Sequence, residues 1–200
     1  MEKKIIKLFL LNQKLKFNEI EKLIETRSNK LAYHLKNLVK KNVLEKEKEF
    51  YKLSKSSEYL IPYLSDKKQV ISVILVHIGN SKKCFLSKRE KRPFKDKLGL
   101  PGGRLIVGEP IEKSVERIMK EKHNMNVNFK KINSISLEHV KSAKSKVHSF
   151  LLIFATAITK ENIELTNIEK NKTKIIKSDY ELLKNDLNKK AKIKTVYSKT

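Results

Sequence analysis

The residues best suited to chemistry gather in the middle of the chain. A glycine pair, Gly102 and Gly103, lies in a predicted loop, where the lack of side chains lets the backbone approach a ligand closely. Arg104 follows directly, and Lys122 and the basic loop 88–97 supply further cations. Together these residues predict a pocket that holds phosphate groups without a metal. Two alternatives stay open, namely nonspecific contacts with a DNA backbone and a solvated basic surface.

A predicted helix over about residues 110–122 carries the remaining reactive side chains. Positions 118, 121 and 122 are three and four residues apart, so they share one helix face. That face holds one apolar residue, Ile118, one acid, Glu121, and one cation, Lys122. Glu121 also follows Arg117 by four residues, the spacing of a helical ion pair, and Ile118 can extend the apolar stripe of the helix.

The same segment carries a longer pattern. After Leu-Pro-Gly-Gly-Arg at 100–104, five residues separate Gly103 from Glu109, and seven more separate Glu109 from Arg117. This order and spacing resembles the Nudix box, with Gly103, Glu109 and Arg117 as its frame. The resemblance extends over residues 69–189 and implies an α/β/α sandwich with a mixed sheet.

The catalytic part of the box departs from the family. Nudix enzymes split a diphosphate linked to another moiety, and box glutamates bind the Mg²⁺ that orients the attacking water. The resemblance places Ile118, Glu121 and Lys122 where three glutamates are expected. A lysine there removes an attraction for Mg²⁺ and adds a repulsion. Glu121 is thus the one catalytic and metal-binding candidate, unless Glu112 or Glu138 compensates, and Mg²⁺ is expected only if the protein is an enzyme.

Strands and helices must hold these residues in place. The apolar, β-branched run 70–76 predicts a buried strand, and 84–86 predicts a second one. Pro110 suits the first position of the helix that follows Glu109. A terminal helix is expected over 178–188, and residues 193–197 are compatible with an edge strand.

The first third of the chain has a different organisation. Helical spacing of apolar residues predicts a helix over 2–13, a second one capped by Asn18 and a third one capped by Ser28. Two short strand-like runs, 43–46 and 50–53, follow. The sequence from Leu31 to Leu44 closely resembles the recognition helix and wing of metal-repressor-type winged-helix regulators.

In that family the third helix enters the major groove of DNA, where exposed polar residues reach bases and phosphates. Lys46 and Lys48 are candidates for contacts from the wing. The alternatives are an ordinary solvated helix face and a protein-binding surface. The resemblance implies the following DNA-binding residues: Arg27, Ser28, Asn29, Lys30, Tyr33, His34, Lys36 and Lys40.

Composition sets the outer limits. The 200 residues carry a formal charge of +24, which favours a polyanionic partner, although a lysine-rich composition has the same effect without function. Residues 1–66 hold 15 Lys and Arg against 9 Asp and Glu, and residues 67–200 hold 31 against 13, so the second segment is the more basic one. A buried Cys84, no membrane-spanning stretch and no leader pattern predict a cytoplasmic protein.

These observations predict a winged helix-turn-helix domain over 1–66 and a Nudix-like domain over 67–200, joined near a helix or extended connector at 57–65. In winged-helix regulators a helix at this place often mediates dimerisation, so a homodimer is expected. The predicted function is a transcriptional regulator that binds double-stranded DNA and senses a nucleotide or phosphorylated metabolite. The alternatives are an active Mg²⁺-dependent Nudix hydrolase of nucleoside diphosphate derivatives and a scaffold without a small ligand.

Overall fold

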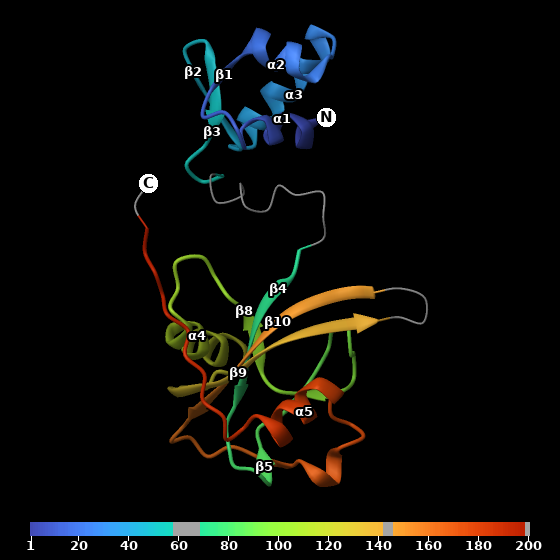
Figure 1. The fold of residues 1–200 in the computed structure, drawn as a ribbon, viewed down its shortest axis with the longest axis vertical. Coiled ribbons are helices and arrows are strands. Elements are labelled where there is room, and N and C mark those ends of the chain that lie inside the picture. Colours follow the sequence, from blue (N-terminus) through green and yellow to red (C-terminus); the bar gives the residue numbers. More distant parts are fainter. Residues whose placement is uncertain (58–68, 142–145, 199–200) are drawn as a thin grey trace. The chain divides into compact units, whose positions relative to one another are not determined.

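The computed structural model describes residues 1–57, 69–141 and 146–198, apart from the side chains of 146 and 147. The chain divides into two compact units, Met1–Gln69 and Val70–Thr200 (Figure 1). The connector expected at 57–65 lies, beyond its first residue, outside the described part of the chain. No helix among the described residues is long and apolar enough to cross a lipid bilayer.

The first unit consists of three helices and a small antiparallel sheet. Its core is formed by residues such as Ile5, Ile20, Leu31 and Leu35, all at most 1% exposed. The sheet has the order β1-β3-β2, with β2 and β3 forming the expected hairpin. The elements are α1 Glu2–Leu8, β1 Leu15–Lys16, α2 Phe17–Ile24, α3 Ser28–Lys40, β2 Leu44–Glu47 and β3 Phe50–Leu53.

The helix ends of this unit differ from the sequence prediction. Helix α1 stops at Leu8, where the Asn12 side chain donates to the Leu8 carbonyl over 2.8 Å and satisfies an end group. Asn18 lies inside α2 and is not its cap. The Glu19 carboxylate accepts the Lys16 N–H at 2.7 Å, so Lys16 is the N-cap and the helix begins at Phe17, earlier in the chain than expected. Ser28 is the first residue of α3 and makes no cap, because its hydroxyl donates to Glu21.

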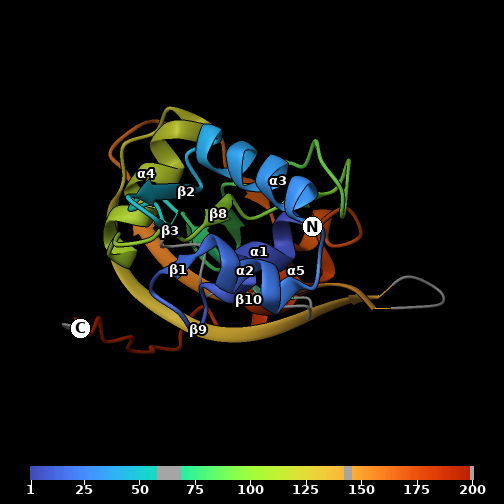
Figure 2. The same cartoon turned by 90° about the horizontal axis from the view of Figure 1, so that it is seen from above.

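The second unit is built on a four-stranded mixed sheet of order β8-β4-β10-β9. Strand β10 runs parallel to β4 and antiparallel to β9, and β8 pairs antiparallel with β4. Figure 2 shows that β9 and β10 bend strongly along their length, where the ladder contains register shifts. The four strands are β4 Ile71–His77, β8 Gly102–Arg104, β9 Asn128–Lys141 and β10 Lys146–Ile158.

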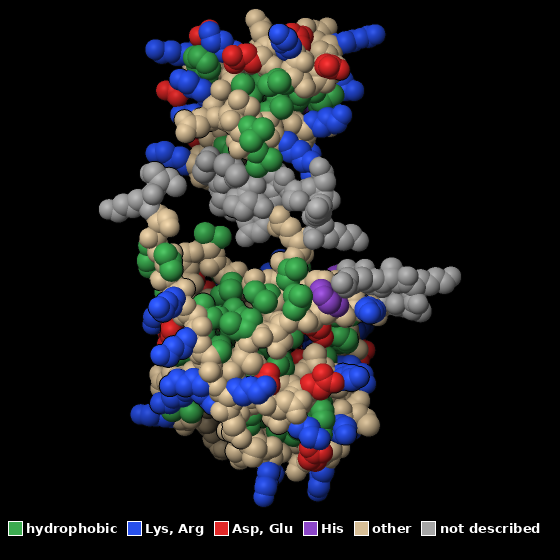
Figure 3. Space-filling model, viewed as in Figure 1, with side chains coloured by type: hydrophobic (Ala, Val, Ile, Leu, Met, Phe, Trp, Pro, Cys, Tyr) green, Lys and Arg blue, Asp and Glu red, His purple; other side chains and the backbone are tan. Residues whose placement is uncertain are grey.

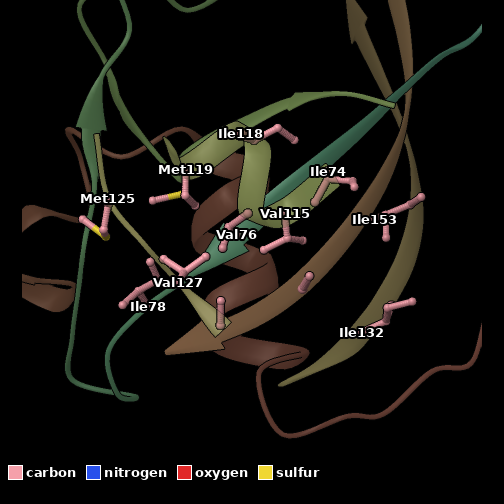
Figure 4. Close-up of a cluster of buried hydrophobic side chains, with 12 residues drawn as sticks. Ile74, Val76, Ile78, Val115, Ile118, Met119, Met125, Val127, Ile132 and Ile153 are labelled. Atoms are coloured by element: carbon pink, nitrogen blue, oxygen red, sulfur yellow. The ribbon is translucent and has the colours of Figure 1, made fainter. Parts of the chain in front are cut away.

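The remaining elements cover the two faces of this sheet. Helix α4 packs through Val115, Ile118 and Met119 on one face (Figure 4), and α5 packs through Leu182 and Leu183 on the other. The expected α/β fold with a mixed sheet is thus confirmed. These elements are β5 Lys83–Cys84, β6 Ser87–Lys88, β7 Leu98–Gly99, α4 Ile111–His123, β11 Thr166–Asn167, the 3₁₀ helix Glu169–Asn171 and α5 Lys177–Asn185.

Some details of the second unit correct the sequence prediction. Pro110 is the N-cap of α4, so the helix begins one residue later than expected. Helix α5 ends at Asn185, and residues 193–197 form no strand. The edge contact falls instead on Ala191, whose N–H donates to the Ile132 carbonyl at 2.9 Å. Cys84 is buried as expected, and burial raises the pKa of its thiol to about 12.

Candidate ligand-binding site

Arg117 joins the loop after β8 to helix α4. Its guanidinium donates to both carboxylate oxygens of Glu109 over 2.9 to 3.1 Å, and to the Arg104 carbonyl at 3.2 Å. The Ser114 hydroxyl donates to the same Glu109 carboxylate at 2.6 Å. Hydrogen bonding from Arg117 holds the pKa of Glu109 below its usual value, against the opposing effect of burial. Glu109 and Arg117 therefore hold the loop against α4, and the Arg117 donors are used within the protein.

Ile118 belongs to the hydrophobic core. Its side chain is fully buried, among neighbours that include Ile74, Val115 and Met119 (Figure 4). It also packs against β8, since a Cβ atom added to Gly103 would come within 2.7 Å of Ile118 Cγ1. A glycine is required there because helix and strand approach too closely for a side chain.

Glu121 and Lys122 point to different partners. The Glu121 side chain is 59% exposed and pairs with Arg117 Nη1 at 3.3 Å, the ion pair expected from the spacing. The Lys122 ammonium donates to the Gly102 carbonyl. Desolvation lowers the pKa of Lys122, and the nearby Arg89 and Arg117 lower it further.

This arrangement does not fit Mg²⁺, which requires several oxygen ligands at once. Of the three box positions, one is in the core, one carries an ammonium and one holds a carboxylate paired with Arg117. Across all described residues, no group of three or more His, Cys, Asp or Glu side chains is arranged to hold a metal ion.

A cavity of about 310 Å³ opens beside these residues. Its lining combines cationic, apolar and aromatic side chains. Glu138, Asp179 and His148 complete the polar lining. The cationic residues are Arg89, Arg92, Arg104 and Lys122, the glycines are Gly102 and Gly103, and the apolar residues are Ile71, Val73, Leu75, Pro93, Phe94, Phe150, Leu152 and Ile176.

Asp179 is a functional candidate that the sequence analysis missed. It lies in the first turn of α5, is 4% exposed, and accepts the Leu100 N–H at 2.7 Å. Burial raises the pKa of its carboxyl to about 7. One signal was present in the sequence, because Asp179 precedes Leu182 and Leu183 by three and four residues and so falls on the apolar stripe of the helix.

A second cavity of about 480 Å³ lies next to the first and shares Glu138 and Leu152 with it. Its other charged residues are one lysine, Lys177, and two acids, Glu181 and Asp186. This balance suits an anionic ligand poorly. Lys and Arg side chains are also spread widely over the visible surface of both units (Figure 3), so the cavity with its four cations marks the site better than surface charge does.

Most residues implied for DNA binding lie on the exposed side of α3 and its N-cap. The Tyr33 side chain is 64% exposed. Two residues make contacts within the unit, since Ser28 donates to Glu21, and His34 is half-buried with Nδ1 3.9 Å from Glu2. The remaining exposed residues of this group are Arg27, Asn29, Lys30, Lys36 and Lys40.

No protein-family model and no curated protein matches the chain. Similar solved structures are Nudix proteins, the family that the motif resembles. The MutT protein from Methanosarcina mazei Go1 has a TM-score of 0.48 and 16% identity, covering 60% of this chain and 94% of that protein. A NUDIX hydrolase from Nitrosomonas europaea has a TM-score of 0.45 and 16% identity, covering 53% and 78%.

The NUDIX domain of Shewanella oneidensis NrtR, solved in complex with ADP ribose, has a TM-score of 0.44 and 15% identity, covering 63% of this chain and 94% of that one. At these values the similarity assigns neither an activity nor a ligand to this chain.

Proposed function

We propose that this protein is a DNA-binding transcriptional regulator, in which residues 67–200 form a Nudix-type domain that binds a nucleotide or another phosphorylated small molecule without efficiently cleaving it. One observation carries the proposal. Where the motif calls for metal-binding carboxylates, Ile118 is buried in the core and Lys122 donates to Gly102 in the wall of a cationic cavity.

The composition of the cavity supports a phosphorylated ligand. Arg89, Arg92 and Arg104 line it together with Lys122, and guanidinium groups match the geometry of phosphate oxygens. Phe94 and the partly buried Phe150 lie in the same wall, and aromatic side chains of this kind stack on nucleobases. A nucleotide would use both the cationic and the aromatic side chains of the lining.

The first unit supplies the DNA-binding part of the proposal. Its three helices and hairpin follow the winged-helix order, and the exposed side of α3 presents Asn29, Lys30, Tyr33 and Lys36. Asn and Lys read base edges in the major groove, while Lys and Arg at the helix ends suit phosphates. His34 contributes less, because its ring is turned toward Glu2.

A homodimer is part of the proposal. Strand β9 forms an edge of the sheet, and the chain near Ala191 covers this edge at Ile132. Farther along the strand, Ile135 and Leu137 are 45% and 56% exposed. Antiparallel pairing of two β9 edges about a two-fold axis would cover both residues in each copy. Light scattering on Leu137→Lys tests this, with a monomer expected and an unchanged dimer counting against the β9 interface.

The decisive experiment is a ligand screen with two readouts. Thermal shifts are measured against nucleotides and phosphorylated metabolites, and each stabilising compound is added to a gel-shift assay on the DNA upstream of the gene. We expect at least one compound to raise Tm and also change DNA affinity, because regulation requires unequal binding to two conformations. If no compound stabilises the protein and DNA binding shows no sequence preference, a scaffold role is favoured.

The same preparation tests the hydrolase alternative. The Glu138 carboxylate lines the cavity and is the observation that favours this alternative. Nucleoside diphosphate derivatives are incubated with the protein and Mg²⁺, and Glu121→Gln serves as the comparison. We expect no efficient turnover. Clear turnover that Glu121→Gln abolishes would overturn the proposal that this domain only senses its ligand.

A further inference from the structure

We infer that Lys122 is a built-in counter-ion that takes the part of a divalent metal, so that the cationic cavity binds a diphosphate group in the complete absence of Mg²⁺. This inference rests on the proposed function, because it specifies how the same cavity recognises a phosphorylated ligand. The residues that make the site unsuitable for Mg²⁺ are the same ones that would bind the diphosphate.

The contact of Lys122 with Gly102 fixes the ammonium at the cavity. An ammonium group has three N–H donors and no acceptor. The Gly102 carbonyl accepts one of these donors, and both residues line the cavity. Two donors therefore remain for phosphate oxygens. Arg89, Arg92 and Arg104 line the same cavity, so the ammonium stands among cations that a bound anion would neutralise.

Arg89 supplies a second cation with unused donors at the cavity. Its Nε is buried and has no hydrogen-bond partner among the described residues, and Arg89 lines the same cavity as Lys122. A buried donor without an acceptor costs free energy, so an oxygen acceptor brought to this guanidinium would stabilise the site. Arg117 is different, because Glu109, Glu121 and the Arg104 carbonyl use its donors.

The charges of the cavity also disfavour a free metal ion. Four cationic side chains line it, against the two carboxyl groups of Glu138 and Asp179. Because the pKa of Asp179 is about 7, a large fraction of its carboxyl is uncharged at neutral pH. A divalent cation would meet more repulsion than attraction here, whereas a diphosphate would meet the opposite.

Isothermal titration of the full chain with inorganic pyrophosphate tests the inference, once in EDTA and once in Mg²⁺. We expect binding in EDTA that Mg²⁺ does not strengthen. Lys122→Gln is expected to weaken this binding about tenfold or more, since a hydrogen bond to a charged group has that effect. Lys122→Arg retains the charge and is expected to stay within about threefold of the native affinity. Lys120→Gln is the matched control, because it removes a charge from an exposed residue of the same helix that does not line the cavity.

Each other outcome contradicts the inference, but not always the proposed function. Binding that requires Mg²⁺ overturns the counter-ion and leaves the phosphorylated ligand standing. Binding in EDTA that Lys122→Gln leaves unchanged overturns the role of Lys122 alone. No binding of pyrophosphate under either condition removes the basis of both, and thermal denaturation of each variant separates lost binding from lost folding.

Discussion

Removing the Arg117 guanidinium is expected to destabilise the loop between β8 and α4, which follows the cavity residue Arg104. The change Arg117→Met keeps the apolar stem of the side chain and deletes its charge. It removes three hydrogen bonds to Glu109, one to the Arg104 carbonyl and one to the exposed Glu121 carboxylate. The Arg117 and Glu109 side chains are 22% and 19% exposed, so a largely desolvated carboxylate would lose its cation.

The magnitude follows from this partial burial. Breaking a fully buried ion pair by removing one partner costs about 3–5 kcal/mol, and an exposed pair contributes about 0–1 kcal/mol. Since Ser114 still donates to Glu109 and a fifth of each side chain is exposed, we expect a loss of about 2 kcal/mol. Lys113→Met is the matched control, because it breaks the exposed Lys113–Glu116 pair of the same helix and should cost far less than Arg117→Met.

Urea unfolding followed by circular dichroism measures the loss, and hydrogen exchange shows whether it falls on α4 and the loop before it. The pH dependence supplies a second check. Arg117 holds the pKa of Glu109 below its usual value. The stabilisation is therefore present above the unfolded pKa of about 4.3 and is lost as the pH falls through the folded value. A difference between native protein and Arg117→Met that is as large at pH 3 as at pH 7 would refute the ion-pair explanation.

Three further changes test other parts of the structure. Gly103→Ala is expected to cost about 1–3 kcal/mol through contact with Ile118 Cγ1. In a double-mutant cycle, Ile118→Ala removes that atom and should make the two losses less than additive, whereas additive losses would contradict the contact. The pKa of the Asp179 carboxyl is raised to about 7, so the native protein is expected to lose about 2 kcal/mol of stability as the pH rises from about 5 to 8. Asp179→Asn should abolish this loss, which urea titrations at both pH values measure. Lys40→Gln should weaken binding to all DNA sequences alike and lower the salt slope by about one unit, while Lys22→Gln on the preceding helix should leave the slope unchanged in a filter-binding assay.

Local spacing was sufficient to predict the helix that carries the motif, whereas Gly102 and Gly103 belong to strand β8 and not to the expected loop. Glu109 and Arg117 are eight residues apart, and Arg117 and Glu121 four apart, so the first turns of one helix decide their contacts. The same holds for the mixed α/β class, because the β-branched run of β4 and the amphipathic α4 each specify their own element. These features depend on neighbours in the chain.

The composition of the cavity depends on contacts between distant segments, which the sequence pattern does not specify. Asp179 accepts a hydrogen bond from Leu100, 79 positions away, and Glu138 reaches the cavity only because β9 lies at the sheet edge beside β10. The interpretation of Ile118 was open for the same reason. From the sequence, an apolar residue on that face of α4 can either belong to the core or be exposed. The close approach of Gly103 to Ile118 shows that it belongs to the core.

That approach also explains why one substitution on this face of α4 would not create a cluster of carboxylates. Lys122→Glu would place a second acid beside Glu121, but Ile118 would still fill its place between α4 and β8. A glutamate at 118 would bury a carboxylate among apolar side chains, at a cost of several kcal/mol, roughly the size of a small domain's whole stability margin. Ile118 thus fills the space between α4 and β8, while Lys122 lines the cavity. An acid at position 118 would therefore require repacking of α4 against β8.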